Sequence, residues 1–143
     1  MNIAVRKNPV ARAFTLIELI AVIVVLAILS GIAIPKYFDY AANAKASATK
    51  GALGGMRSAI ANYYANQAVN GSAAYPSLAL LTTMGTVMQE AIPNNPYNNS
   101  NSVKSATWAA TPPVAGAEGW AYDVAVGRIW ANSTTTGVNE HLW

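Results

Sequence analysis

The sequence predicts an α+β protein in which one long N-terminal helix packs on a small antiparallel β-sheet. An apolar run with a single charged residue covers residues 14–34. Beyond Pro35, apolar residues continue to recur at three- and four-residue spacing to about residue 64, which is typical of an amphipathic helix. Later, residues 119–124 alternate large apolar with smaller residues, and a glycine turn leads into a second apolar run. This pattern predicts a β-hairpin.

Composition and charge indicate one modest domain with a membrane segment. The chain has 143 residues, of which 53% are apolar and only 10% charged, against about a quarter in ordinary soluble domains. The net charge of +3 comes from Arg6, Lys7 and Arg12, because the acids and bases beyond Ala13 balance. Basic residues beside an apolar run mark its cytoplasmic side. No clustered basic face is visible, so no nucleic-acid partner is predicted. The absence of cysteine excludes disulfides and thiolate metal sites.

The apolar run has the length of a membrane-spanning helix. Its residues 14–34 would form about 31 Å of helix. A cleavable secretory signal would have a shorter core ending at a small-residue cleavage site, whereas this core runs into Pro35 and Lys36. A plain single-span anchor explains the length and the flanking charge. It explains neither Glu18 nor the amphipathic pattern that continues past the span.

The residues around the start of this run have a distinctive order. A basic leader is followed by the small residue Ala13 and then by Phe14-Thr-Leu-Ile-Glu18. This order resembles the class III signal of type IV pilins and of the pseudopilins of type II secretion systems. The resemblance implies that a prepilin peptidase cuts between Ala13 and Phe14 and methylates the new N-terminus to N-methylphenylalanine. The family usually has glycine before the cut, and this chain has Ala13.

Glu18 and Pro35 are the two unusual residues of the helix that follows. An acid within a membrane helix is costly and calls for a partner. Cleavage would free an amine at Phe14, and Glu18 of one copy could pair with the amine of another. A neighbour in the wrong register would leave both charges unpaired, so we interpret Glu18 as a register device for assembly; the alternative is that it only caps the helix. Pro35 predicts a helix kink or, alternatively, the end of the membrane helix.

We divide the chain into four segments by these features. The leader peptide is 1–13, the transmembrane and filament-core helix 14–35, the amphipathic helix 36–70, and the C-terminal globular head 71–143. We expect the continuous helix to end near residues 68–71.

Within the head, local patterns predict three features. Ser77 should cap a short helix over 77–84. Residues 92–100 are dense in turn formers and predict an ordered or mobile loop, which resembles the Pro-Tyr loop of major pseudopilins. The hairpin should pack on the helix face formed by residues 53–64. The hairpin residues expected there are Trp120, Tyr122 and either Ile129 or Trp130.

The inventory of chemical groups does not indicate an enzyme. The single histidine, His141, is expected on the surface, and no nucleophile motif or metal-ligand spacing occurs. No cofactor is predicted. The resemblance to major pseudopilins implies a possible calcium site in the C-terminal loops, and calcium needs about six to eight oxygen ligands. Glu118, Asp123 and Glu140 are too dispersed to form such a site, so no metal is predicted.

The resemblance implies a structural subunit that polymerises through its N-terminal helix into a type IV pilus-like extracellular filament. The partners implied are the prepilin peptidase, further copies of the chain, an inner-membrane assembly platform and minor pilins. The chain would lie in the inner membrane as a single-pass precursor and then in an extracellular pilus or periplasmic pseudopilus. One alternative is a major pseudopilin of type II secretion, favoured by the missing disulfide and the Pro-Tyr loop. The other is a monomeric, single-span membrane-anchored binding domain.

Overall fold

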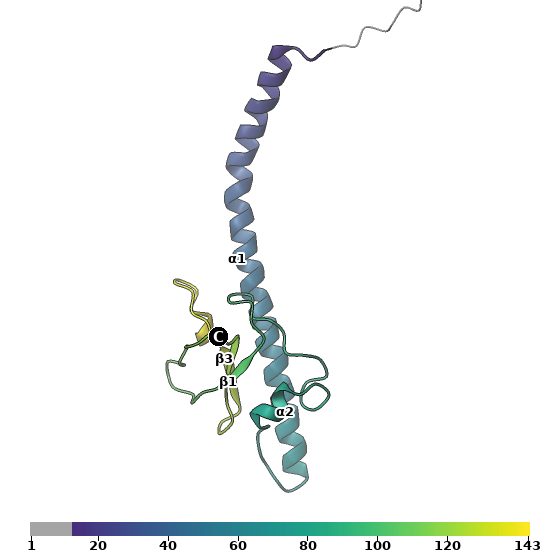
Figure 1. Ribbon diagram of the computed structural model, residues 1–143, viewed down its shortest axis with the longest axis vertical. Coiled ribbons are helices and arrows are strands. Elements are labelled where there is room, and N and C mark those ends of the chain that lie inside the picture. The colour runs from purple at the N-terminus through teal and green to yellow at the C-terminus, as the bar shows by residue number, and fades with distance from the viewer. Residues whose placement is uncertain (1–12) are drawn as a thin grey trace, which may run out of the picture. The chain divides into compact units, whose positions relative to one another are not determined.

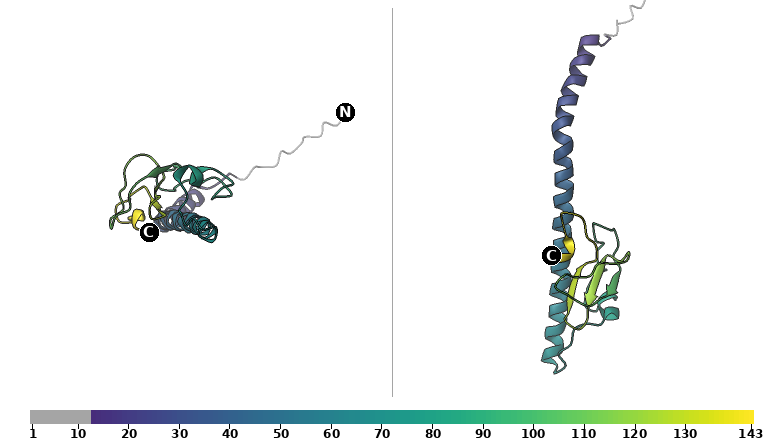
Figure 2. Two further views of the ribbon diagram at one scale, coloured as in Figure 1. Left: turned by 90° about the horizontal axis from the view of Figure 1, so that it is seen from below. Right: turned by 90° about the vertical axis from the view of Figure 1, so that its left-hand side faces the viewer.

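A long helix, α1, forms the N-terminal part of the computed structural model, which describes residues 13–143. It covers Leu16–Val69 and remains helical through Pro35 (Figure 1, Figure 2). The interpretation of Pro35 as the end of the helix is therefore wrong: one proline removes one hydrogen bond, and the residues around it favour a helix. The kink stays a prediction. Contacts divide the chain into two compact units, one ending at Tyr40 and one beginning at Ala41, and each is described by itself.

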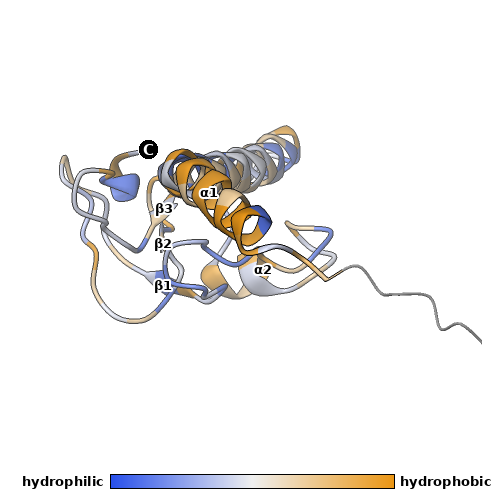
Figure 3. Cartoon of the chain, turned by 90° about the horizontal axis from the view of Figure 1, so that it is seen from above, coloured by the Kyte–Doolittle hydropathy of each residue, from blue (hydrophilic) through white to orange (hydrophobic). Residues whose placement is uncertain are grey.

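The first unit exposes its apolar side chains. Large hydrophobic residues from 14 to 34 are between 41% exposed, at Ile20, and 85% exposed, at Phe14. The described residues contain one helix long and apolar enough to cross a membrane, and it is this one. Figure 3 shows the hydrophobic colour concentrated on this part of α1. So large an apolar surface calls for a lipid or protein covering.

The second unit has its core between the distal half of α1 and the sheet. Leu53, Met56 and Ile60 form the buried stripe of the helix. The sheet residues in the same cluster include Trp120, Tyr122 and Ile129, which confirms the first two and selects Ile129 over Trp130. The hydroxyl of Tyr122 donates to the carbonyl of Pro76 at 2.9 Å. Burial, aided by Tyr75 and Asp123, raises the pKa of Tyr122 to about 12.

The sheet has three short strands, β1 (Val103–Ser105), β2 (Trp120–Asp123) and β3 (Arg128–Ala131), in that spatial order. Strands β2 and β3 form the predicted antiparallel hairpin, with Trp120 opposite Ala131. Strand β1 pairs parallel to β2, so the small sheet is antiparallel, as predicted, only between β2 and β3. A parallel pair needs a long crossover, and residues 106–119 supply it.

The outer face of the hairpin is also buried. The indole of Trp130 donates to the carbonyl of Pro113 at 3.0 Å, and its ring meets the Trp108 ring edge-on at 5.4 Å. The crossover segment thus covers the face of the sheet opposite to α1. Because this segment covers the second face, Ile129 and Trp130 are both buried although they lie on opposite faces of the sheet. The alternation of apolar residues in the sequence therefore could not show which of the two packs on α1.

Two short helices complete the head. Helix α2 (Leu78–Thr82) is capped by Ser77, whose side chain accepts the backbone N–H of Leu80 at 3.3 Å, as predicted. Helix η1 (Glu140–Leu142) lies against β3. Because of this contact His141 is only 8% exposed, so the expectation of a surface histidine is wrong.

Candidate assembly site

A capping box between Thr15 and Glu18 caps the N-terminus of α1. The Glu18 Oε2 atom accepts the backbone N–H of Thr15 at 2.8 Å and its hydroxyl at 2.7 Å. In return, the N–H of Glu18 donates to the Thr15 hydroxyl at 3.3 Å. Each partner satisfies a backbone donor that the first helical turn leaves free. The signal for this cap, a threonine three residues before a glutamate, is in the sequence, but the prediction treated Thr15 only as part of the motif and gave it no capping role.

The geometry leaves part of the Glu18 carboxylate available. Both hydrogen bonds from Thr15 end on Oε2, and among the described residues no donor reaches Oε1. Phe14 and Ala13 precede the helix and are exposed. The arrangement therefore lets Glu18 cap its own helix and still accept a further donor from outside. Pro35 lies well inside α1, away from this cluster.

The other acids named from the sequence serve the head and are not gathered together. Asp123 accepts the backbone N–H groups of Trp108 at 2.7 Å and Ala125 at 2.8 Å. These hydrogen bonds, led by the one from Trp108, hold the pKa of Asp123 below its usual value. Within residues 13–143, no three His, Cys, Asp or Glu side chains are grouped so that they could hold a metal ion.

Glu140 anchors the C-terminal segment. Its carboxylate accepts the N–H of Thr135 at 2.9 Å and the Thr135 hydroxyl at 3.0 Å. Burial alone would raise the pKa of Glu140, but hydrogen bonds from backbone N–H groups and from the side chains of Ser133 and Thr135 outweigh it and lower the pKa. Glu140 and Asp123 thus have structural roles, each satisfied by its own set of donors.

Comparison with known proteins bears on the N-terminal part of the chain. The family described as the prokaryotic N-terminal methylation motif matches residues 9–34. The fimbrial protein EcpC of Eikenella corrodens is 42% identical over 60 residues, which are 42% of this chain and 39% of that protein. The type IV major pilin protein PilE of Neisseria gonorrhoeae is 40% identical over 62 residues, 43% of this chain and 37% of PilE.

A longer match extends into the head. The type IV major fimbrial protein FimA of Dichelobacter nodosus is 34% identical over 89 residues, 61% of this chain and 55% of FimA. The chain thus spans between about two fifths and just over half of the length of these curated relatives. No solved structure matches the chain.

A long apolar N-terminal helix, a small sheet and an N-terminal methylation motif together define a protein with a prepilin-type signal. In this N-terminal part the chain is similar to type IV pilins, the similarity that its residues 13–18 indicated. The leader residues 1–12 lie outside the described residues, so their role rests on the sequence and the motif.

Proposed function

We propose that this chain is a structural subunit that polymerises through α1 into a type IV pilus-like filament. The observation that carries the proposal is the exposed apolar first unit of α1, which begins with a carboxylate that has an unused oxygen. Membrane lipid can cover this surface in a precursor, and neighbouring helices can cover it in a filament. The names of the relatives, which are pilins and fimbrial proteins, support the same role.

Processing would prepare the subunit for assembly. A prepilin peptidase would cut between Ala13 and Phe14 and methylate Phe14, and the new amine would then lie one helical turn from Glu18. In the filament, Oε1 of Glu18 in one copy would accept a hydrogen bond from the N-terminal amine of a neighbouring copy. The Thr15 cap need not break in this step, because it uses Oε2. The kink at Pro35 would adjust the helix to its neighbours.

The remaining partners and the location follow from this role. An inner-membrane assembly platform and minor pilins would act on a single-pass inner-membrane precursor, and the head would lie outside the cytoplasm. The role is structural and not enzymatic, as it is in relatives that are named for their fimbriae.

Replacing Glu18 by alanine tests the proposal, with Thr15→Ala as the matched control. Both variants lose the capping box, but only Glu18→Ala loses the charge. We expect wild-type and Thr15→Ala chains in sheared filament fractions, detected by immunoblotting and electron microscopy, and no filaments from Glu18→Ala. Normal filaments from Glu18→Ala would refute the register role. Equal loss in both variants would assign the effect to the cap.

Mass spectrometry of the mature N-terminus tests the processing step. We expect a chain that begins at Phe14 and carries one added methyl group, and a chain that retains Ala13 would contradict the proposed cut. Long surface fibres would support the pilus. Short periplasmic assemblies, together with a secretion defect on deletion, would instead favour the pseudopilus, which the ordered loop at residues 92–100 still allows.

A further inference from the structure

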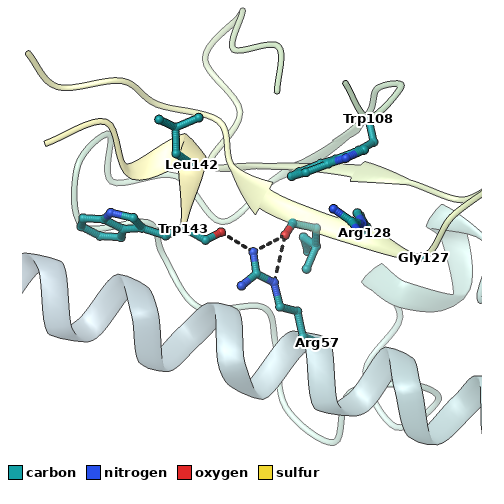
Figure 4. A pocket seen from close by; sticks show the side chains of 7 residues that line it. Arg57, Trp108, Gly127, Arg128, Leu142 and Trp143 are labelled. Atoms are coloured by element: carbon teal, nitrogen blue, oxygen red, sulfur yellow. Dashed lines mark hydrogen bonds between the residues drawn. The ribbon is translucent and has the colours of Figure 1, made fainter. Parts of the chain in front are cut away.

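Aromatic side chains of the second unit pack against other groups of that unit, as two pairs show. In the pocket of Figure 4, the Arg128 guanidinium lies over the Trp108 ring at 4.6 Å. The Tyr64 ring stacks on the Tyr75 ring, also at 4.6 Å. The packing of the head therefore accounts for the presence of these aromatic residues.

The first unit carries three aromatic residues that its own packing does not explain. Tyr37, Phe38 and Tyr40 lie within four positions of α1 and are 71%, 67% and 69% exposed. The ring centroids of Tyr37 and Phe38 are 6.2 Å apart in an edge-on arrangement. Between Phe14 and Tyr63 the sequence contains no other aromatic residue. The aromatic side chains are therefore gathered at one level of the helix, just beyond the apolar run.

This level matches the headgroup layer of a membrane that the apolar run spans. The hydrocarbon core of a bilayer is about 30 Å thick and the whole bilayer about 40–45 Å, which leaves about 5–8 Å for each headgroup layer. Tyr37 follows Ile34, the end of the run, by three residues, or about 4.5 Å. Tyr40 follows it by six residues, or about 9 Å. Because helical side chains lean toward the helix N-terminus, here toward the run, all three rings fall within this layer or at its edge.

The arrangement around the helix fits a surrounding medium better than a single packed partner. A helix face that packs on one partner repeats its apolar residues every three or four positions. Phe38 and Tyr40 instead point about 160° apart around the axis, at about 100° per residue. Lys36 and Asp39 occupy the rest of this level, and residues 36–40 are all exposed. A headgroup layer accepts such a mixture, because rings contact the acyl chains while polar ends reach water.

We propose that Tyr37, Phe38 and Tyr40 form an aromatic belt that binds the lipid headgroup layer on the outer side of the inner membrane and fixes the depth of the precursor. Tyrosine suits this layer because its ring is apolar and its hydroxyl forms hydrogen bonds. The Lys36 ammonium, at the same level, can reach a lipid phosphate. The basic residues before the run mark the cytoplasmic side, so the belt lies on the opposite side. The inference rests on the proposed function, because it concerns the single-pass precursor.

Photocrosslinking identifies what the belt contacts. The full chain, with photoreactive benzoylphenylalanine placed at position 37, 38 or 40 in turn, is reconstituted in vesicles of phosphatidylethanolamine and phosphatidylglycerol and irradiated. We expect mass spectrometry to show the mass of one added lipid at each of the three positions. The control position is the exposed Ser47, well beyond the apolar run in the sequence, which should give no lipid adduct. Crosslinked dimers in place of lipid adducts would overturn the proposal by assigning the belt to a second copy.

Position 28, in the middle of the apolar run, separates this inference from the proposed function. Ile28 is 61% exposed in α1, and a membrane-spanning run should give a lipid adduct there. Lipid adducts at position 28 but at none of the three belt positions would overturn the belt and leave the membrane precursor intact. No lipid adduct at position 28 would refute the membrane precursor and, with it, the belt.

Cysteine labelling tests whether the belt fixes the depth of the helix, since the chain contains no cysteine of its own. The Ile34→Cys variant in the same vesicles is treated with a membrane-impermeant maleimide. Changing all three belt residues to serine should raise the labelling rate about 2-fold or more, because holding a span at one depth is worth fractions of a kcal/mol per Å. Changing all three to tryptophan, which also prefers the headgroup layer, should keep the original rate. An unchanged rate in the serine variant would overturn the role of the belt in setting depth.

Discussion

Replacing Asn95 by alanine should lower the stability of the head strongly, because this side chain ties three segments together. Asn95 is fully buried in the loop of residues 92–100. Its amide nitrogen donates to the carbonyl of Gly119 at 2.8 Å and to the Ser133 hydroxyl at 2.9 Å. Its oxygen accepts the N–H of Tyr97 at 3.0 Å. Alanine would remove all three hydrogen bonds and leave buried partners without a replacement.

The magnitude follows from these three bonds. At about 1 kcal/mol each, their loss costs about 3 kcal/mol. For a head of less than about 100 residues this lowers the midpoint of thermal unfolding by roughly 12–24 °C. Tryptophan fluorescence of the full chain in detergent reports the transition, because Trp120 and Trp130 are fully buried in the head.

Asn94 provides the matched control, since it is the adjacent asparagine and is exposed. Asn94→Ala should change the free energy of unfolding by less than about 0.5 kcal/mol. Asn95→Asp keeps the acceptor for Tyr97 but loses the amide donors, so it too should destabilise the head. If Asn95→Ala and Asn94→Ala shift the midpoint equally, the role assigned to Asn95 is wrong.

Three further predictions concern the second unit, which begins at Ala41. Gly119→Ala would place a methyl group against the backbone carbonyl of Ser100, so it should lower the free energy of unfolding, measured in urea, by about 3 kcal/mol or more. In Gly51→Ala the added methyl group meets open space, so this variant should raise the free energy of unfolding by about 0.5–1 kcal/mol. Equal changes in the two variants would contradict this reasoning. Tyr122→Phe should abolish the last tyrosine ionisation in an alkaline titration, near pH 12. The folded pKa of Glu140 is lowered, so its contribution to stability is present above its ordinary pKa and is lost as pH falls through the folded value. In Glu140→Gln the free energy of unfolding should therefore fall less steeply as the pH is lowered through the acidic range. An unchanged slope would exclude this contribution of Glu140 to stability.

Local sequence patterns were sufficient for much of the fold. The apolar run, the Ser77 cap and the hairpin of β2 and β3 each depend on residues within a few positions of one another. The same is true of the resemblance carried by residues 13–18. Such features are encoded by helical spacing, by strand alternation and by capping residues.

Features that depend on distant residues were not predicted. Arg57 joins α1 to the carbonyl of Ile129 across 72 positions, and no pattern near Arg57 indicates this. The burial of His141 arises from the docking of η1 on β3. The parallel pairing of β1 depends on a crossover whose path the sequence does not reveal. These contacts are set by tertiary packing, which single-sequence patterns report only weakly.

The edge strand β1 is short, and this limits how readily the sheet can pair with the sheets of neighbouring chains. Its ladder with β2 covers only Val103–Ser105, and the chain then turns away into the proline-containing crossover. An exposed sheet edge is a template for adding strands of other chains, and a long edge invites aggregation. In the filament that we propose, heads would lie side by side at high local concentration, where such an edge could pair with that of a neighbour. With so few free backbone groups at this edge, the sheet offers little to cross-β growth, so in the filament that we propose the helices would carry the ordered polymerisation.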